Sequence, residues 1–347
     1  MRAVMYRGFG DEPEIVELDR PDCPPRGALV RVRATGLCRS DWHAWSGHDP
    51  AVALPHVPGH EFAGEIAELG TDVGTDAGWA VGDRVTAPFI CACGRCGECA
   101  TGNEQVCDAQ RQPGFTHWGS FAEYVVVDEA ELNLIRLPDT LGFIEAASLG
   151  CRFATAYRAI ITRGRLQPGE QVAVHGCGGV GLSAIMIAVA AGVPVFGVDV
   201  SDAALAAAAE LGATPIRGGE GAAERIREAS GGGVDLSVDA FGSSATSFAS
   251  VRSLKKRGRH VQIGLMLAES ATAAMPMDAV IDGELEILGS HGMAAREYPD
   301  MLGAVASEAF RPIELVGRTI GLQDVPEALA AMGRAGGAGS RMTVVEL

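Results

Sequence analysis

Four cysteines in the first third of the chain are spaced closely enough to bind one metal ion. They follow the pattern C-x2-C-x2-C-x7-C, through Cys93, Cys96, Cys99 and Cys107. Four thiolates complete a tetrahedral zinc shell, so the spacing predicts a structural zinc site. An iron–sulfur cluster also uses four thiolates and is the main alternative, although nothing else in the sequence indicates electron transfer. Cys91 is left outside the set because the other four are more regularly spaced.

A second group of ligand-type side chains is scattered along the chain. Cys38 and His60 precede the four-cysteine segment, Glu61 adjoins His60, and Cys151 is the available third ligand. Two thiolates and one imidazole leave the fourth zinc position open, which is typical of catalytic rather than structural zinc. Each residue alone is more often part of a packed core, so the prediction depends on their occurring together.

A glycine-rich turn in the middle of the chain predicts a dinucleotide site. A short apolar segment ends at His175, to which we assign no role, and a G-x-G-x-x-G turn then opens an apolar helical run. The glycines allow a close approach to a pyrophosphate, whose charge a helix N-terminus stabilises. The turn residues expected to contact the cofactor are Gly176, Gly178, Gly179, Val180 and Gly181.

Asp199 indicates which dinucleotide this is. It ends the next apolar segment, near the position where an acid binds the ribose hydroxyls of NAD. An acid there repels the extra phosphate of NADP, and no Lys or Arg lies between Asp199 and Glu210 to bind that phosphate. The sequence therefore favours NAD, although a simple capping role for Asp199 is the alternative.

The elements that position these groups follow two patterns. Up to about residue 150, short apolar segments cut by Gly and Pro predict a mainly β domain, with strands at 28–34, 61–66, 83–87 and 122–127. From about residue 170, strands alternate with alanine-rich helices, which predicts a parallel sheet covered by helices. The strands are expected at 171–175, 195–199, 234–239 and 259–264, and the helices at 180–191, 203–211, 222–229 and 244–254, with Ser201 as an N-cap.

The domain organisation follows from this change of pattern. We expect an α/β protein with a catalytic domain over 1–152, a nucleotide-binding domain over 153–290, and a C-terminal part over 291–347. A last strand at 342–346 is expected to rejoin the first domain. The glycine-rich stretches 231–233 and 336–339 are expected to be loops.

The composition fits an enzyme that acts on a small molecule. The chain of 347 residues suits two domains, and 47% hydrophobic with 21% charged residues supports buried cores. A net charge of -16 repels phosphate backbones and anionic lipid, so nucleic acid and membranes are not expected partners. No export leader is recognised, which favours the cytoplasm. The apolar run 180–198 is broken by Gly192 and Pro194, so we interpret it as a helix, a turn and a strand.

Several motifs together resemble the zinc-containing medium-chain alcohol dehydrogenases over nearly the whole chain. These motifs are Gly36-Leu37-Cys38-Arg39-Ser40-Asp41-Trp42-His43, Gly59-His60-Glu61, the four-cysteine segment, Gly150-Cys151 and the glycine turn. The resemblance implies a GroES-like catalytic domain, completed by the C-terminal tail, and a Rossmann domain. It also implies a homodimer or homotetramer, more often the tetramer in chains without long insertions.

The resemblance assigns a role to individual residues. It implies that Cys38, His60 and Cys151 bind a catalytic zinc, and that Glu61 is a transient or alternative ligand behind it. The four-cysteine segment takes the structural zinc. The remaining implied roles are a carboxylate that orients His60 (Asp41), a hydroxyl that contacts the substrate oxygen (Ser40), the base at the end of the proton relay (His43), pyrophosphate contacts (Arg39 and Arg341) and further cofactor contacts (Ile263 and Leu265).

The implied reaction is hydride transfer from an alcohol to NAD, which gives an aldehyde or a ketone. Ser40 and His43 would pass the hydroxyl proton toward solvent. Trp45, Phe89, Trp118 and Leu265 resemble pocket-lining positions, and two tryptophans would favour small primary or flat aromatic alcohols.

Three alternatives stay open at this stage. A polyol or amino-alcohol dehydrogenase would share every motif, although several such relatives carry glutamate in place of Cys151. A non-catalytic NAD- and zinc-binding protein would not need the zinc ligands together with Ser40 and His43. A zinc-free reductase is disfavoured by the complete ligand set.

Overall fold

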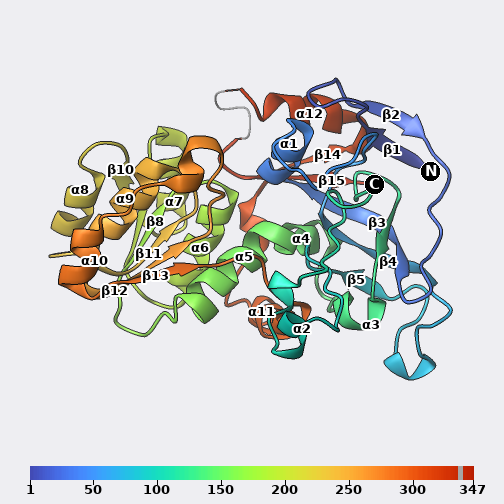
Figure 1. Cartoon of the computed structure of the whole chain (residues 1–347), viewed down its shortest axis with the longest axis horizontal. Coiled ribbons are helices and arrows are strands. Elements are labelled where there is room, and N and C mark those ends of the chain that lie inside the picture. Colours follow the sequence, from blue (N-terminus) through green and yellow to red (C-terminus); the bar gives the residue numbers. More distant parts are fainter. Residues whose placement is uncertain (335–338) are drawn as a thin grey trace. The chain divides into compact units, whose positions relative to one another are not determined.

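A computed structural model describes residues 1–334 and 339–347 of the chain (Figure 1). Two compact units are present: Met1–Ala154 with Gly292–Leu347 forms the first, and Thr155–His291 forms the second. The expected mixed α/β architecture is confirmed. Of the two predicted glycine loops, the one at 336–339 lies mostly outside the described residues.

The first unit is built on a sheet of seven strands. Its order is β14-β15-β3-β4-β5-β7, with β6 also paired to β3, and a separate pair is formed by β1 and β2. The strands of the whole first unit, with the separate pair included, are β1 (Arg2–Met5), β2 (Glu14–Glu17), β3 (Ala28–Leu37), β4 (Glu61–Leu69), β5 (Arg84–Thr86), β6 (Tyr124–Val127), β7 (Ile135–Arg136), β14 (Val316–Gly321) and β15 (Met342–Glu346). Its helices are α1 (Arg39–Trp45), α2 (Gly97–Ala100), α3 (Ala130–Asn133), α4 (Phe143–Ser148), α11 (Tyr298–Ala306) and α12 (Val325–Ala331).

The pairing of β3 with β4 sets the position of the first group of ligands. The two strands are antiparallel, and Gly36 near the end of β3 lies opposite Glu61 at the start of β4. Their apolar faces are buried with β5 and β6 in one core that contains Val30, Phe62 and Val85. Residues just beyond Leu37 and just before Glu61 are therefore neighbours, although more than 20 positions separate them in the sequence.

The C-terminal strand completes this sheet. β15 occupies the predicted range 342–346 and pairs antiparallel with β3 of the first unit. Strand β14, which pairs parallel to β15, was not predicted. None of its six residues is fully buried, and its sequence lacks the apolar alternation by which a half-buried strand is recognised.

The second unit is a doubly wound parallel sheet with the order β10-β9-β8-β11-β12-β13. The strands are β8 (Val172–His175), β9 (Val195–Asp199), β10 (Thr214–Arg217), β11 (Val234–Asp239), β12 (Leu254–Gln262) and β13 (Glu286–Gly289). The helices are α6 (Gly179–Ala190), α7 (Asp202–Glu210), α8 (Ala222–Ala229), α9 (Ser244–Arg252) and α10 (Met277–Gly283), and the short α5 (Ala154–Tyr157) precedes them. The strand order reverses between β8 and β11, and ligands of such sheets bind at this switch point.

The sequence located most of these elements. The four predicted helices agree with α6 to α9 to within two residues, and Ser201 caps α7 by accepting a hydrogen bond from the Ala204 amide. Strand β12 begins at Leu254 rather than at residue 259. The sequence did not indicate its first half because that half carries exposed Lys255, Lys256 and Arg257 and a register shift. β10 and β13 were missed since each is a short edge strand with at most one buried residue.

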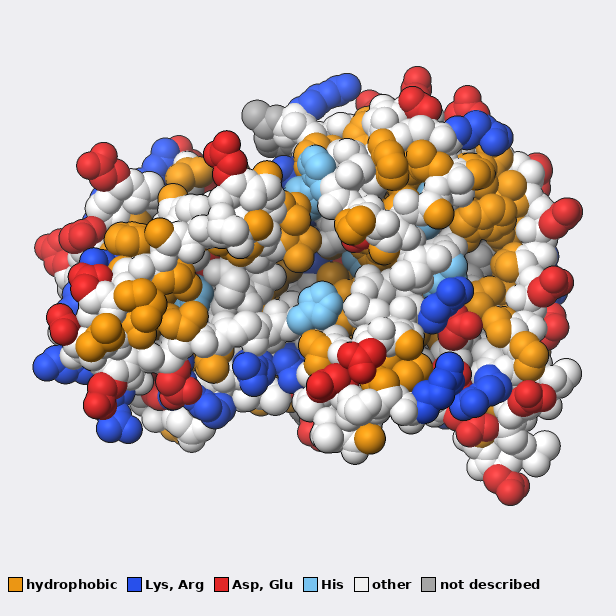
Figure 2. Space-filling view, in the orientation of Figure 1, with side chains coloured by type: hydrophobic (Ala, Val, Ile, Leu, Met, Phe, Trp, Pro, Cys, Tyr) orange, Lys and Arg blue, Asp and Glu red, His pale blue; other side chains and the backbone are white. Residues whose placement is uncertain are grey.

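The apolar run 180–198 forms α6, a turn and β9, as interpreted from the sequence. Among the described residues, no helix combines the length and the apolar character needed to span a membrane. On the face in Figure 2, acidic and basic side chains are interspersed.

A chain of buried polar side chains runs through the second unit where α9 packs on β11 and β12. Ser237 Oγ lies 2.7 Å from Ser250 Oγ, which lies 2.8 Å from Nδ1 of His260. The Nε2 atoms of His260 and His175 are buried without a hydrogen-bond partner among the described residues. Burial lowers the pKa of His175 to about 3 and that of His260 to about 4, and the proximity of His260 contributes at His175. Both imidazoles are therefore neutral in the folded protein.

These two histidines predict acid sensitivity. Below the ordinary histidine pKa of about 6.5 the unfolded chain binds protons that the folded chain does not, so stability falls as pH drops toward 4. Each buried imidazole contributes up to about 1.4 kcal/mol per pH unit. His175→Leu removes one of them and should flatten the pH dependence of the unfolding free energy between pH 6 and 4 by about that slope, measured by denaturant titration. Equal slopes for variant and wild type would contradict this assignment.

Candidate active site and metal centres

The four cysteines of the C-x2-C-x2-C-x7-C segment lie together in the first unit. One ligand atom from each of Cys93, Cys96, Cys99 and Cys107 lies within 4.8 Å of the other three. Cys96 is the N-cap of α2, and its sulfur accepts a hydrogen bond from the Cys99 amide. Amides of Cys99 and Asp108 lower the pKa of Cys96 to about 6, which favours the thiolate that a metal requires. The donor set fits one tetrahedral zinc ion.

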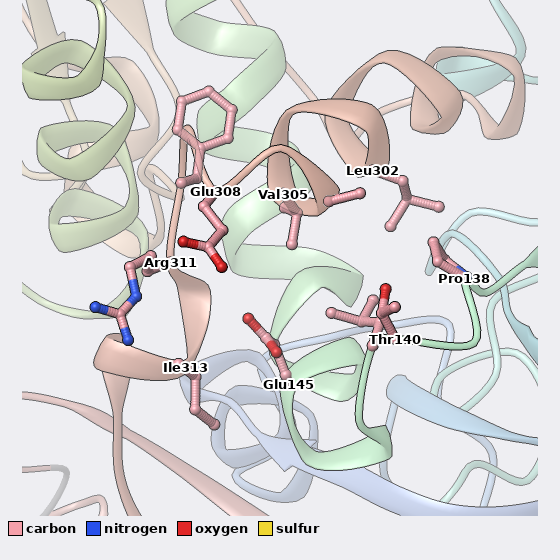
Figure 3. A pocket seen from close by; sticks show the side chains of 11 residues that line it. Pro138, Thr140, Glu145, Leu302, Val305, Glu308, Arg311 and Ile313 are labelled. Carbon is pink, nitrogen blue, oxygen red and sulfur yellow. The ribbon is translucent and has the colours of Figure 1, made fainter.

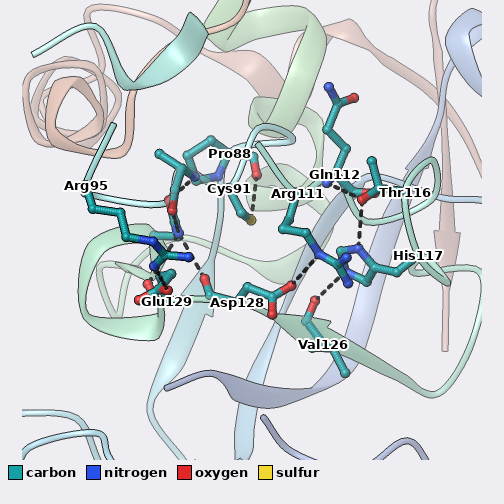
Figure 4. A network of polar contacts seen from close by, with 12 residues as sticks. Pro88, Cys91, Arg95, Arg111, Gln112, Thr116, His117, Val126, Asp128 and Glu129 are labelled. Atoms are coloured by element: carbon teal, nitrogen blue, oxygen red, sulfur yellow. Dashed lines mark hydrogen bonds and ion pairs between the residues drawn. The ribbon is translucent and has the colours of Figure 1, made fainter. Parts of the chain in front are cut away.

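Polar contacts link residues in and beside the cysteine segment to one another and to Asp128 and Glu129 (Figure 4). The backbones of Cys91 and Arg111 exchange two hydrogen bonds of 2.8 and 2.9 Å. Arg111 is paired with Asp128 at 3.2 Å, and Arg95 with Glu129 at 2.8 Å. The two ends of the cysteine segment are therefore held together by the protein itself.

Cys91 is outside the group of four. Its buried thiol donates a weak hydrogen bond to the Pro88 carbonyl at 3.7 Å. Burial raises the pKa of this thiol far above its ordinary value, and the charge of Asp128 adds to the effect. Cys91 is therefore kept as a neutral thiol and packs as a small apolar side chain.

The second ligand group consists of Cys38, His60, Glu61 and Cys151. One donor atom of each lies within 4.8 Å of the others. Cys38 follows β3 and caps α1, and His60 and Glu61 lie at the start of β4. Cys151 lies in a π-helical turn, Leu149–Phe153, that follows α4. The structure thus brings together residues from three separate segments, as the scattered motifs required.

Asp41 organises this group from behind. Its Oδ1 lies 2.7 Å from Nδ1 of His60 and accepts the Gly59 amide at 3.1 Å, while its Oδ2 accepts the Cys38 amide at 2.9 Å. Burial disfavours the charged imidazole, but the Asp41 carboxylate outweighs burial and raises the pKa of His60. Both Asp41 and His60 are fully buried. One carboxylate therefore orients the imidazole and two backbone segments at once.

The group fits a zinc ion by the chemistry of its donors. With Nδ1 bound to Asp41, the Nε2 of His60 is buried and has no hydrogen-bond partner among the described residues. The pKa of Cys38 is held well below its ordinary value by hydrogen bonding to Cys151 and by the charges of His60 and Arg152. A buried, unpartnered imidazole nitrogen beside two thiols is the donor set of a three-ligand zinc site.

Arg152 is a contact of this group that sequence reasoning missed. Its guanidinium binds both carboxylate oxygens of Glu61, with Nε donating to Oε1 at 3.0 Å and Nη2 forming a close ion pair with Oε2. Burial raises the pKa of Glu61, and Arg152 opposes that shift. The Gly150-Cys151 motif indicates Cys151 as a ligand but does not include Arg152, the next residue.

Ser40 and His43 both lie on α1. Ser40 lies near the ligand group, and His43 lies near the protein surface. Ser40 Oγ lies 3.8 Å from Cys38 Sγ. His43 Nδ1 lies 3.0 Å from Nδ1 of the exposed His48, another residue that the sequence did not single out. Burial lowers the pKa of His43 to about 4, with contributions from His48 and Arg39, so His43 is neutral at pH 7 and can accept a proton.

Of the predicted pocket residues, only Phe89 contacts the ligand group through its ring. The rings of Phe89 and His60 are 6.1 Å apart, and Phe115, which was not predicted, is 5.1 Å from His60. Trp45 donates to the Asp11 carbonyl at 2.6 Å. Trp118 packs with an apolar cluster around Ala3, Met5, Val57 and Ala122.

The glycine turn of the second unit lies at the carboxyl end of β8, at the switch point of the sheet. Gly176 has φ +89°, and Gly178 is the N-cap of α6, so Gly179, Val180 and Gly181 form the first turn of that helix. A Cβ on Gly178 would meet no atom within 4 Å. The protein's own packing therefore leaves open space beside this glycine, as expected where a pyrophosphate approaches the backbone.

Asp199 ends β9 next to the turn. Its carboxylate accepts the amides of Cys177 and Ser201, each at 2.8 Å. A carboxylate has about four acceptor positions, so two remain for ribose hydroxyls. Exposed apolar side chains surround this edge of the sheet, namely Val200, Phe241 and the predicted Leu265, and Ile263 follows β12.

The two predicted pyrophosphate-binding arginines belong to the first unit. Arg39 donates to the Met332 carbonyl and stacks on Trp42, with 4.6 Å between its guanidinium carbon and the indole ring. Arg341 donates to the Glu314 carbonyl at 2.5 Å.

Comparisons with known proteins agree with this arrangement. Residues 24–139 match the family described as alcohol dehydrogenase GroES-like domain, and residues 179–307 match the family described as zinc-binding dehydrogenase. An alcohol dehydrogenase of Geobacillus stearothermophilus is 35% identical over 294 residues, which is 84% of each chain. This chain belongs to the zinc-type medium-chain dehydrogenase/reductase family.

Other relatives of this dehydrogenase span the whole fold. An NAD-dependent alcohol dehydrogenase of Saccharolobus solfataricus is 32% identical over 343 residues, or 95% of each chain. A D-arabitol-phosphate dehydrogenase of Enterococcus avium is 29% identical over 335 residues, or 94% and 93% of the two chains. The solved alcohol dehydrogenase from Thermus sp. ATN1 has a TM-score of 0.89 at 30% identity, and the match covers 100% of this chain and 99% of that one.

A separate hollow of about 230 Å³ lies in the first unit of the dehydrogenase (Figure 3). Apolar side chains of α11 and the carboxylates of Glu145 and Glu308 line it. None of its lining residues belongs to either ligand group. Burial raises the pKa of Glu145.

We expect Cys107 to bind zinc and Cys91 not to bind it. Cys107→Ser should reduce the zinc content of the purified dehydrogenase by one ion per chain and lower its Tm by several degrees, because a structural site contributes folding energy. Cys91→Ser is the matched control, since that thiol is buried nearby but outside the group, and it should leave the zinc content unchanged. Loss of zinc from the Cys91 variant would mean that the fourth ligand is misassigned. Elemental analysis and thermal unfolding measure both effects.

The open space beside Gly178 predicts a selective defect. Gly178→Ala should raise the Kd for NADH by about tenfold or more while leaving Tm nearly unchanged, because the added methyl meets no protein atom but occupies the space expected for the pyrophosphate. Gly142→Ala is the control, because Gly142 caps α4 with equally open surroundings. Unaltered NADH binding by the Gly178 variant, measured by fluorescence titration, would contradict the placement of the dinucleotide.

Proposed function

We propose that this dehydrogenase catalyses the reversible oxidation of primary or secondary alcohols by NAD, with one catalytic and one structural zinc per chain. The observation that carries the proposal is the group of buried Cys38 and His60 with half-buried Cys151, in which an imidazole nitrogen without a partner among the described residues lies beside two thiols. The products are an aldehyde or a ketone and NADH.

The chain's own residues hold the reactants and move the proton. A zinc ion bound by this group supplies Lewis acidity, which lowers the pKa of an alcohol hydroxyl. Ser40 would orient the hydroxyl and accept its proton as it gives up its own, and His43, neutral at pH 7, would pass a proton outward. The hydrogen bond between His43 and exposed His48 supports a route to solvent.

The choice of NAD rests on Asp199 and the glycine turn. The carboxylate at the end of β9 favours ribose hydroxyls over a 2′-phosphate, and the open space at Gly178 suits the pyrophosphate. Ile263, Leu265, Arg39 and Arg341 are proposed as further cofactor contacts. The NAD-dependent relative from Saccharolobus solfataricus supports the same choice.

The proposed substrates are small or flat alcohols. Phe89 and Phe115 place aromatic surface beside His60, which suits an apolar substrate better than a hydroxylated one. Trp45 packs against the apolar cluster that contains Phe115, and Trp45 and Trp118 are proposed as further residues of the substrate pocket. A polyol substrate remains the second candidate, favoured by the similarity to a D-arabitol-phosphate dehydrogenase.

We also propose a homodimer or homotetramer, as the family resemblance implies. In the second unit, β13 is the edge strand of the six-stranded sheet. Large apolar side chains on β13 and on α10 are exposed, namely Ile287, Met277 and Ile281. Burying this surface against another subunit would remove it from water.

The deciding experiment is NADH formation from a series of alcohols. Ethanol, longer primary alcohols, benzyl alcohol, secondary alcohols and a polyol are compared, with NADP in a parallel set. We expect faster turnover with NAD and a maximum for small or flat alcohols. Cys38→Ser should reduce kcat at least about 100-fold, because it removes a ligand of the zinc that stabilises developing charge, while NADH binding is retained.

Two outcomes would contradict this proposal. Absence of turnover across the series, in protein shown to hold two zinc ions per chain, would favour a non-catalytic binding protein. Activity confined to the polyol would favour the polyol dehydrogenase.

A further inference from the structure

Glu61 lies close enough to the proposed zinc site to compete with the substrate for the metal. One of its carboxylate oxygens lies within 4.8 Å of donor atoms of Cys38, His60 and Cys151, so it is close enough to become a fourth ligand. The side chain is fully buried. A carboxylate that occupied the fourth position would exclude the alcohol.

Four hydrogen-bond donors hold this carboxylate in place. Oε1 accepts the backbone amides of Cys151 at 3.3 Å and Arg152 at 2.9 Å, and Nε of Arg152 at 3.0 Å. Oε2 forms the close ion pair with Nη2 of the same guanidinium. Bidentate arginine–carboxylate pairs fix direction as well as distance.

The surroundings leave the pair little freedom. The Arg152 side chain is only 8% exposed. A Cβ on Gly36 would lie 2.2 Å from Glu61 Oε2 and 2.8 Å from Arg152 Nη2, so β3 packs directly against both groups. The pair therefore fills a space that only a glycine on β3 leaves open.

Charge balance explains why both groups are retained. A divalent zinc ion with two thiolates and a neutral imidazole has no net charge, and Glu61 would add a negative charge that weakens its Lewis acidity. The guanidinium of Arg152 cancels the charge of Glu61 without binding the metal. Removing the guanidinium alone would leave a buried carboxylate with two backbone amides and no cation, so a zinc ion at this site would be the cation available to it.

We propose that Arg152 is a positioning residue that holds Glu61 away from the fourth ligand position and so keeps that position open for substrate. This inference rests on the proposed zinc site. It assigns to Arg152 a role that neither the zinc ligands nor the proton relay supplies.

Imidazole binding to the cobalt-substituted protein tests the proposal without NAD or alcohol. Co²⁺ in a thiolate site absorbs visible light, and imidazole that enters the open position changes the spectrum, which gives a Kd. We expect Arg152→Met to weaken imidazole binding at least about tenfold, because freed Glu61 competes for the metal. The double variant Arg152→Met/Glu61→Gln should bind within about threefold of wild type.

The controls separate positioning from stability. Arg259→Met removes a partly buried ion pair with Glu170 in the second unit and should leave the imidazole Kd unchanged. If Arg152→Met does not fold, Arg152→Lys keeps the charge but loses the bidentate contact, and it should weaken imidazole binding in a way that Glu61→Gln reverses.

Two results would overturn the proposal. One is wild-type imidazole affinity in the Arg152 variants. The other is a double variant as weak as the single variant, since Arg152 would then act through the fold rather than through Glu61. Absence of the cobalt–thiolate spectrum in the wild type would instead refute the zinc site and with it the proposed function.

Discussion

The candidate zinc site depends on the antiparallel pairing of β3 with β4. The register that places Gly36 opposite Glu61 brings the residues after β3 beside those before β4. Because the apolar sides of both strands are buried in the same core, a slip by one residue would turn Phe62 and Val30 out of that core. The position of Cys38 relative to His60 is thus determined by hydrophobic packing some distance from the site.

Buried charges then refine what the sheet positions. Asp41 and Glu61 are both fully buried, and each accepts hydrogen bonds from several protein donors. Asp41 orients the imidazole of His60, and Arg152 neutralises Glu61. A single unsatisfied charge in this region would be costly, so the two networks constrain one another through the short segment Gly59-His60-Glu61.

In the second unit, a parallel sheet positions the candidate cofactor residues. At the switch point of its parallel sheet, the glycine turn and Asp199 bring amides, a helix N-terminus and a carboxylate together, and this is where we propose that NAD binds. The neutral histidines His175 and His260 lie in the sheet beneath, where burial excludes their charged forms. The predicted acid sensitivity and the proposed cofactor site therefore depend on the same strands.

The sequence by itself determined the features that depend on local spacing. The four-cysteine segment, the glycine turn and helices α6 to α9 are each encoded within short stretches, whose periodicity or ligand spacing can be recognised directly. The predicted residue types for the second zinc group were also accessible, because Cys38, His60 and Cys151 each belong to a local motif.

Tertiary structure decided what depends on contacts between distant segments. Arg152 has no pattern of its own, and its meaning comes from Glu61, 91 positions earlier. His48 and Phe115 gain significance only through His43 and His60, and Trp118 packs in an apolar cluster that no local pattern indicated. Edge strands β10, β13 and β14 bury too little to leave a periodic signal, so their pairing is set by the neighbouring strand rather than by their own residues.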